Sequence, residues 1–235
     1  MSRPLTLVCG DLSAMPLFEL ADANGHREGY EPAVGALLAE TLGRPLKWEF
    51  RSWSDMLPSL DDPEVDGVLC GQGISPSRLE VADFTRPYAV FDESVLVRGD
   101  DPASSPADLV GRQVAAIAGS VNLTLAQTFE GAYVVPFDGN SDDVFGDMLG
   151  ALSSGEVDAV VDDDVALLPL DGDERFSVAF TVPTRNPWGI ATSKARPERR
   201  DEIDAALDKV IASGELRAVW EHWLPGLAFP LGGDA

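Results

Sequence analysis

Apolar residues along the chain follow two alternating patterns, compact runs and longer segments with helical spacing. The compact runs predict strands at residues 5–9, 46–50, 65–70, 113–118, 133–137, 157–161, 176–182 and 188–192. The helical segments predict helices at residues 31–42, 53–60, 75–82, 121–129, 142–152, 197–213 and 215–223, with a short one after Ser105. Strands that alternate with helices are typical of βα units and a mostly parallel sheet, so we predict an α/β fold.

The predicted elements form two βα blocks of similar plan, followed by two helices that fit neither block. A repeated block with a closing tail indicates two lobes, and a tail packed on the first lobe requires the chain to cross between the lobes twice. We therefore predict a first lobe of residues 1–97 and 187–235, carrying both termini, and a second lobe of residues 98–186. Ligands of such α/β proteins bind in the crevice that faces the carboxyl ends of the strands.

Composition and charge narrow the possible partners. The chain has 235 residues, of which 45% are hydrophobic and 24% charged, as in a globular protein with a substantial core. It carries 17 Lys and Arg against 40 Asp and Glu, a formal net charge of −23. Such a surface repels phosphate backbones and anionic headgroups, so we expect no nucleic-acid partner and no membrane-surface partner. The same charge favours the approach of cationic ligands, which gives weak support to arginine, lysine or ornithine.

The N-terminal residues bear on the compartment. Residues 1–8 lack the apolar stretch and the small-residue cleavage site of a signal peptide. No apolar run is long enough to span a bilayer. We therefore expect a periplasmic or extracellular location if a leader has been removed, and a cytoplasmic one if Met1 is the native start.

Cysteine and histidine are too few and too scattered to predict a metal centre. Cys9 and Cys70 form no Cys-x-x-Cys pair, and His26 and His222 add no ligand spacing, so we expect neither a metal nor a cofactor. Each cysteine ends a predicted strand, which leaves two alternatives, inert core thiols or free thiols at the crevice floor, and leaves their redox state open. No nucleophile–base arrangement, dinucleotide fingerprint or phosphate loop is present, so no catalytic residue is predicted.

Arg78 is the first candidate binding residue. With Ser75 as N-cap, it is the third residue of a predicted helix, where the positive end of the helix disfavours a cation. A planar guanidinium at this position is suited to bidentate recognition of a carboxylate. The alternative is an arginine that turns outward to a surface acid such as Glu80.

Asp163 is the second candidate, within the run Asp162-Asp163-Asp164. This run follows a buried strand directly, so its carboxylates lie where an ammonium group could bind. The alternative is that these acids cap the helix that follows. Both can hold for different members of the run.

Two glycine-containing turns and one aromatic residue complete the candidates. The turn Gly119-Ser120-Val121-Asn122 joins a strand to a helix and forms a small anion-binding cradle. Gly71 and Gly73 let the backbone approach a ligand closely. Trp53 precedes a predicted helix near the crevice and could stack on a ligand.

Segments in a characteristic order along the chain carry a family resemblance. They include DGVLCGQGISPSR at 66–78 and GEVDAVVDD at 155–163, together with segments 11–19, 29–34, 53–60, 83–88, 108–114, 118–120, 188–191 and 214–220. In order and spacing the chain resembles the family 3 solute-binding proteins of ABC importers for polar amino acids. The resemblance implies a type II periplasmic-binding-protein fold, with two α/β lobes, two crossing strands and a ligand cleft between the lobes.

The resemblance also implies roles for the candidate residues. Arg78 matches the arginine that grips the ligand α-carboxylate, and Asp163 matches the acid that takes the α-ammonium. The positions of Gly71, Gly73, Ser120 and Val121 assist, and an aromatic matching Trp53 often stacks on the ligand. Gly73 and Val121 replace hydroxyl residues common in the family, and loop 12–17 lacks the usual aromatic, so the identity of the amino acid stays open.

The partners implied are a small zwitterionic ligand and the membrane subunits of an ABC importer, and we expect a monomer that is not an enzyme. Two other classes stay open. One is a lyase on the same scaffold that resembles cyclohexadienyl dehydratase, with Asp163 as general acid, although no second acid–base group is evident. The other is a ligand-sensing module of a signalling complex.

Overall fold

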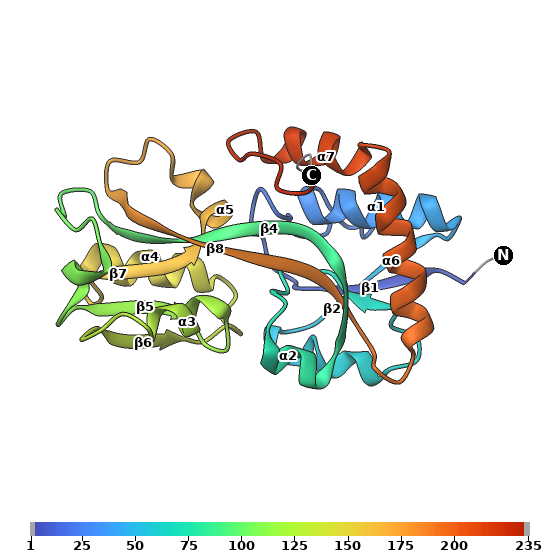
Figure 1. Ribbon diagram of the computed structural model, residues 1–235, viewed down its shortest axis with the longest axis horizontal. Helices are drawn as coiled ribbons and strands as arrows, with labels where there is room; N and C mark the ends of the chain where they lie inside the picture. The colour runs from blue at the N-terminus through green and yellow to red at the C-terminus, as the bar shows by residue number, and fades with distance from the viewer. Residues whose placement is uncertain (1–2, 233–235) are drawn as a thin grey trace. The chain divides into compact units, whose positions relative to one another are not determined.

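The computed structural model describes residues 3–232, and the chain forms two compact units (Figure 1). Unit 1 contains the described residues up to Val90 and from Pro187 onward, and unit 2 is Phe91–Asn186. The long strands β4 (Asp83–Arg98) and β8 (Phe176–Thr192) each contribute residues to both units. The predicted lobe division, 1–97 with 187–235 against 98–186, places its first boundary farther along β4 and stays a prediction.

Unit 1 is a small mostly parallel sheet with helices. Its elements are β1 (Leu5–Cys9), α1 (Tyr30–Leu42), β2 (Leu46–Phe50), the 3₁₀ turns Trp53–Asp55 and Pro58–Asp61, β3 (Gly67–Val68), α2 (Pro76–Val81), α6 (Pro197–Ala212) and α7 (Glu215–Trp223). Strand β1 pairs in parallel with β2 and β3, and β3 pairs antiparallel with β8. The carboxyl ends of β1 and β3 therefore meet at one edge of the sheet.

The core of unit 1 is closed by aromatic contacts. Helix α1 packs against α6 and α7. The ring of Tyr30 on α1 meets Trp220 of α7 edge to face, with centroids 5.4 Å apart, and the Tyr30 hydroxyl donates to the Tyr88 carbonyl at 2.7 Å. This ties the C-terminal helices to the first helix and to β4, as the predicted packing of the tail on the first block requires.

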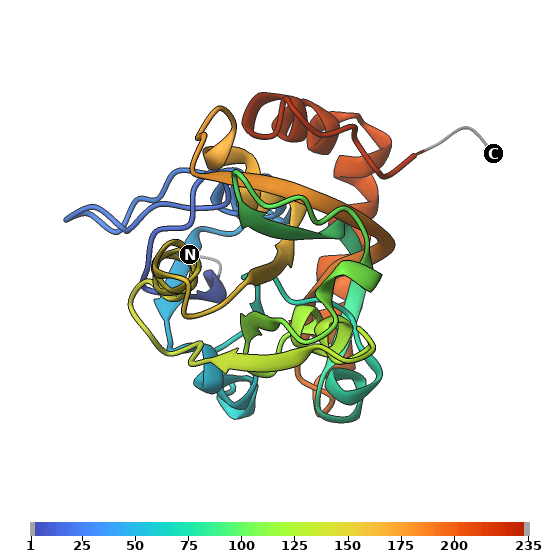
Figure 2. The ribbon, with the colours of Figure 1, turned by 90° about the vertical axis from the view of Figure 1, so that its left-hand side faces the viewer.

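Unit 2 repeats the plan. Its elements are the 3₁₀ turn Pro106–Leu109, β5 (Gln113–Ile117), α3 (Val121–Ala126), β6 (Tyr133–Phe137), α4 (Val144–Ser154), β7 (Ala159–Asp163), α5 (Asp164–Leu167) and the 3₁₀ turn Leu168–Leu170. Strand β5 lies parallel to β6 and β7, and β4 pairs antiparallel with β7. Neighbouring residues of one strand point to opposite faces, and accordingly Val161 packs in the cluster with α3 whereas Val160 packs in the cluster with α4. Figure 2 shows the ribbon from the side of this unit. Burial on both faces explains why these strands are continuous apolar runs.

Some elements differ from those that the pattern predicts. The helix expected at 53–60 is two 3₁₀ turns, because Pro58 lacks the N–H that a continuing helix would use. The pattern predicts no strand at 83–98, where β4 runs. Pro183 and Pro187, which predict a turn, lie inside β8, since their fixed φ also suits extended backbone. Among the described residues, no helix is long and apolar enough to cross a membrane.

Candidate functional site

Arg78 lies in unit 1 at the start of α2, as predicted. The Ser75 hydroxyl oxygen caps the helix by accepting from the Arg78 N–H at 3.3 Å. The half-buried Arg78 side chain folds back, so that Nη1 donates to the Gly73 carbonyl at 2.9 Å. Its guanidinium carbon lies 5.4 Å from the centre of the Trp53 ring, within cation–π range. The structure therefore brings Arg78, Trp53 and Gly73 together.

The segment from Gly71 to Gly73 is held against Trp188 of β8. Gly71 has φ +57, in the left-handed region that favours glycine, and a Cβ there would lie 3.4 Å from the Trp188 ring. Gly73 forms a β-bridge with Trp188, and the Gly71 N–H donates to Glu31 Oε1 at 2.7 Å. Trp188 and Glu31 were not among the predicted site residues, although Trp188 belongs to a segment that carried the family resemblance.

Ser120 caps α3 in unit 2 and begins the second group of candidates. Its hydroxyl accepts from the Leu123 N–H at 3.0 Å and donates to the Ile117 carbonyl at 2.7 Å. Val121 follows as the half-buried first residue of α3. Asn122 is buried, and its side-chain Nδ2 donates to Asp162 at 3.0 Å and to Asp163 at 3.3 Å. The cradle predicted at 119–122 therefore lies beside the acids that end β7.

Asp163 is held by two amides. Asn122 donates to Oδ2, and Asn186 of β8 donates to Oδ1 at 3.3 Å. Asp163 is the last residue of β7 and also stands at the N-cap position of α5, where its side chain makes no capping hydrogen bond. Its carboxylate is thus held by neutral donors and not used as a helix cap.

Two further buried acids surround Asp163. Glu93 of β4 stands opposite Asp163 in the strand register, and Asp162 precedes it. Burial, and secondarily the Asp163 charge, raises the pKa of Glu93 to about 8 and that of Asp162 to about 8. Glu93 Oε2 and Asn122 Oδ1 are buried acceptors without a hydrogen-bond partner. Such a group of acceptors is suited to a cation.

Sequence reasoning did not single out Glu93 and Asn186. Both lie on the long strands that run through the two units, and the pattern predicted neither strand at full length. Glu93 lies in the polar stretch Asp92–Ser94 between Phe91 and Val95, and the apolar residues on both sides of that stretch are the signal that could have indicated a buried acid.

A third group of potential ligand side chains lies in unit 1. Cys9, Cys70 and Glu31 are buried, and one ligand atom from each lies within 4.8 Å of the others. The two cysteines are free thiols. Hydrogen bonding with Cys9, followed by burial, raises the pKa of Cys70 well above its ordinary value. Spacing along the sequence could not predict this cluster, because its members come from three separate elements.

Comparison with known proteins identifies the family. The model of bacterial extracellular solute-binding proteins, family 3, matches residues 7–226. The chain belongs to this family. It is 25% identical over 225 residues to the glutamine-binding protein GlnH of a Bacillus subtilis ABC transporter, covering 93% of this chain and 81% of the relative. It is also 25% identical over 224 residues to the L-arginine-binding protein of Pseudomonas aeruginosa, covering 90% and 85%.

Solved structures of family 3 type share the fold. An ancestral arginine-binding protein bound to glutamine has a TM-score of 0.81 at 26% identity and covers 95% of this chain and 99% of its own. The ancestral amino acid-binding protein AncCDT-1, a precursor of cyclohexadienyl dehydratase, has a TM-score of 0.79 at 26% identity, covering 94% and 95%. The predicted two-lobe α/β fold of periplasmic binding proteins is confirmed. The family description agrees with an extracellular or periplasmic protein and gives no support to the cytoplasmic alternative.

Proposed function

We propose that the protein reversibly binds a free amino acid and delivers it to the membrane subunits of an ABC importer. The observation that carries this proposal is a pair of oppositely charged side chains, each fixed by hydrogen bonds within its own unit: Arg78 in unit 1 and Asp163 in unit 2. One amino acid offers both an α-carboxylate and an α-ammonium, so a single ligand matches both residues. The curated relatives bind glutamine and arginine by name, which supports the class.

Arg78 recognises the α-carboxylate. Its guanidinium is a planar fork of five N–H donors, and the Gly73 carbonyl and the Trp53 ring hold the fork in place. Trp53 then offers an apolar face to the ligand side chain. Because Gly73 and Val121 stand where the family commonly has hydroxyl residues, and the Ser120 hydroxyl donates to the Ile117 carbonyl, this carboxylate site relies on Arg78 and on backbone N–H groups at the start of α3.

Asp163 takes the α-ammonium, and Glu93 directs the choice of side chain. Asn122 and Asn186 donate side-chain amide hydrogen bonds to the two carboxylate oxygens of Asp163 and hold it in place. Glu93 adds a second buried carboxyl whose Oε2 has no partner, and a ligand cation beside it would lower its raised pKa and favour its ionised form. We therefore propose a preference for amino acids with a cationic side chain.

Binding shifts the protein toward a closed form. If Arg78 and Asp163 contact one ligand, that ligand makes its full set of contacts only in the closed form. The free energy of those additional contacts determines how far binding shifts the equilibrium from the open to the closed form. The protein works as an extracellular or periplasmic monomer in this proposal.

A lyase is the second candidate function. One solved relative is described as a precursor of cyclohexadienyl dehydratase, although it is itself an amino acid-binding protein. Glu93 and Asp162, with pKa values near 8, are protonated at neutral pH and suited to general acid chemistry. Incubation with prephenate or arogenate, followed by absorbance, distinguishes the functions, since turnover would make the protein an enzyme.

Calorimetry with matched ligands tests amino-acid binding. Free arginine should bind, whereas agmatine, which lacks the carboxylate, and N-acetylarginine, which lacks the ammonium, should each bind at least about 30-fold more weakly, because each leaves a buried charge unpaired. Glutamine serves as the neutral comparison. Equal affinity for arginine and agmatine would contradict the role of Arg78.

A further inference from the structure

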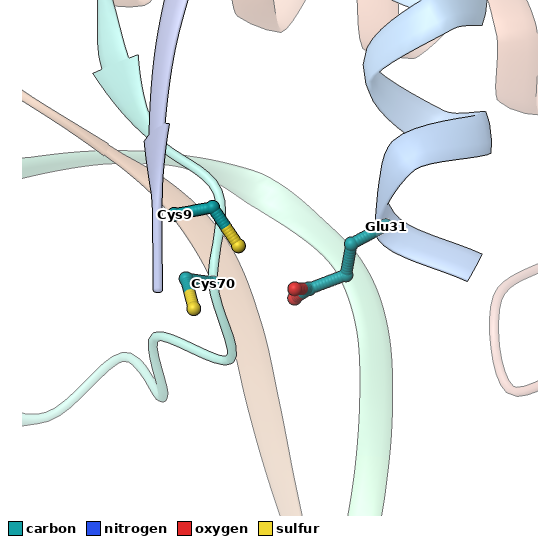
Figure 3. A group of neighbouring side chains, drawn as sticks. All are labelled: Cys9, Glu31 and Cys70. Carbon is teal, nitrogen blue, oxygen red and sulfur yellow. The ribbon is translucent and has the colours of Figure 1, made fainter. Parts of the chain in front are cut away.

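Cys9, Cys70 and Glu31 converge at one edge of the sheet of unit 1 (Figure 3). Cys9 is the last residue of β1, and Cys70 lies just after β3, the parallel neighbour of β1. Glu31 is the second residue of α1. The Glu31 carboxylate points toward the two cysteines, and the exposed fractions are 1%, 4% and 0% for Cys9, Cys70 and Glu31. The fold thus assembles two sulfur ligands and one oxygen ligand out of contact with water.

Glu31 has an unused acceptor inside this cluster. Its Oε1 accepts from the Gly71 N–H at 2.7 Å and from the Tyr88 hydroxyl at 2.5 Å. Its Oε2 is buried and has no hydrogen-bond partner. A carboxylate oxygen buried without a donor is costly, and coordination of a cation removes that cost.

The groups around the cluster hold the ligand atoms in place. The Gly10 N–H donates to Cys70 Sγ at 3.3 Å. The Gly71 N–H and the Tyr88 hydroxyl both donate to Glu31 Oε1, which fixes the carboxylate and leaves Oε2 available to a metal ion. Hydrogen bonds that orient the ligands in this way are the outer shell expected of a metal site.

We propose that Cys9, Cys70 and Glu31 bind a divalent, thiophilic metal ion, with Zn²⁺ the best match. Two thiolates and one carboxylate carry three negative charges. A divalent ion together with the buried guanidinium of Arg27, whose charge acts on Glu31, brings the total to zero, whereas Cu⁺ would leave one negative charge buried.

The geometry is within reach of a zinc centre. Tetrahedral coordination with Zn–S bonds of about 2.3 Å places two sulfur ligands about 3.8 Å apart, so ligand atoms within 4.8 Å need only a small contraction. A water molecule or small anion supplies the fourth ligand. The ion displaces the thiol protons to solvent when it binds. Because Gly71 donates to Glu31, the bound ion would also stiffen the Gly71–Gly73 segment. The inference does not depend on the proposed function.

Titration of the full-length reduced protein with Co²⁺ tests the site. Thiolate coordination gives a near-ultraviolet sulfur-to-cobalt charge-transfer band, which the many surface carboxylates of this acidic chain cannot produce. We expect saturation at one Co²⁺ per chain and loss of the band on addition of one equivalent of Zn²⁺. Thiol counting under denaturing conditions beforehand confirms that both cysteines are reduced.

Variants locate the binding atoms. Cys9→Ser and Cys70→Ser should each abolish the charge-transfer band, and Glu31→Gln should weaken Co²⁺ binding at least about tenfold. The matched control, Glu40→Gln on the exposed side of α1, should bind as the wild type does. Circular dichroism checks that the variants fold. If a variant does not fold, the Co²⁺ titration of the wild-type protein decides the test. Absence of the band with both thiols reduced, or its persistence in a Cys9→Ser/Cys70→Ser double variant, would overturn the proposal.

Discussion

Asp66 in unit 1 and the acids around Asp163 in unit 2 are all buried, but the protein compensates them in opposite ways. In unit 1, Asp66 accepts from Arg3 at 2.7 Å, from Arg44 at 2.6 Å and from Arg199, while the Thr6 N–H donates to Oδ2 at 2.9 Å. In unit 2, Asn122 donates to Asp162 and to Asp163, and Asn186 donates to Asp163.

The difference separates structure from function. Arginine side chains neutralise the charge of Asp66, so this carboxylate stabilises the fold and is not available to a ligand. In unit 2, burial raises the pKa values of Glu93 and Asp162 to about 8, and Glu93 Oε2 has no hydrogen-bond partner. In the proposed function a cationic ligand is the partner of these acids. The predictions that follow test this contrast.

The largest effect on stability should come from Asp66. Removal of one member of a buried ion-pair network leaves uncompensated charge, so Asp66→Ala should lower the free energy of unfolding by about 3–5 kcal/mol. Urea unfolding measures the change. Asp61→Ala, which removes an exposed acid of the same unit, should change it by less than about 0.5 kcal/mol. A small loss at Asp66 would remove the contrast between the units.

Ligand affinity should depend most on Arg78 and Asp163. Arg78→Ala and Asp163→Asn should each weaken binding by about 2–5 kcal/mol, which is 30-fold to several thousand-fold, because each leaves one charge of the ligand unpaired. Calorimetry measures both, with Arg175→Ala as a control, since that exposed arginine forms an ion pair with neighbouring Asp173. Near-wild-type affinity for Arg78→Ala would refute its assignment to the carboxylate.

Stability without ligand should fall as the pH rises. Glu93 and Asp162 have pKa values of about 8 in the folded protein, against ordinary values of 4.5 and 3.8, so the folded state keeps protons that the unfolded chain releases. Their stabilising contribution is complete below about pH 4 and is lost as the pH rises through 8, at up to about 1.4 kcal/mol per pH unit for each group.

Glu31, with a pKa near 7, acts in the same direction. Urea unfolding at pH 5.5, 6.5 and 7.5 measures the slope, and Glu93→Gln should make it shallower because one titrating group is gone. An unchanged slope in that variant would show that Glu93 ionises as an ordinary exposed glutamate does.

Glu93→Gln should also change ligand selectivity. If Glu93 meets a cationic side chain, the variant should lose about tenfold in affinity for arginine, close to 1.4 kcal/mol, and keep its affinity for glutamine. Parallel titrations with the two amino acids measure the ratio. Equal losses for both ligands would place Glu93 in a general structural role and leave the amino-acid site itself intact.

The sequence predicted local features better than contacts between distant segments. The place of Arg78 in the first turn of a helix was predictable because Ser75 and Pro76 mark the start of that helix within a few residues. Strands β1, β5 and β7 were predictable because burial on two faces makes compact apolar runs, whereas the pattern predicted no strand where β4 runs.

Glu93 and Asn186 were not predictable, because their importance depends on pairings between residues far apart in the chain. Glu93 meets Asp163 through the antiparallel register of β4 with β7, and Asn186 reaches the same acid from β8. The same holds for Cys9, Cys70 and Glu31. The spacing of residues along the chain predicts local geometry. The residues of these clusters come together only when strands that are distant in the sequence pair in the sheet.

The smallest effect should come from restoring a hydroxyl beside Ser120. Val121 is the half-buried first residue of α3, where the family commonly has threonine, and Val→Thr keeps the branched shape. If the first turn of α3 contacts the ligand carboxylate, Val121→Thr adds one hydrogen bond and should tighten binding about 2- to 10-fold, the equivalent of 0.5–1.5 kcal/mol. The matched control is Val144→Thr, the half-buried first residue of α4, which should leave affinity unchanged. A gain in both variants would indicate a general effect of threonine at helix starts, whereas a gain in Val121→Thr alone places the ligand carboxylate against α3.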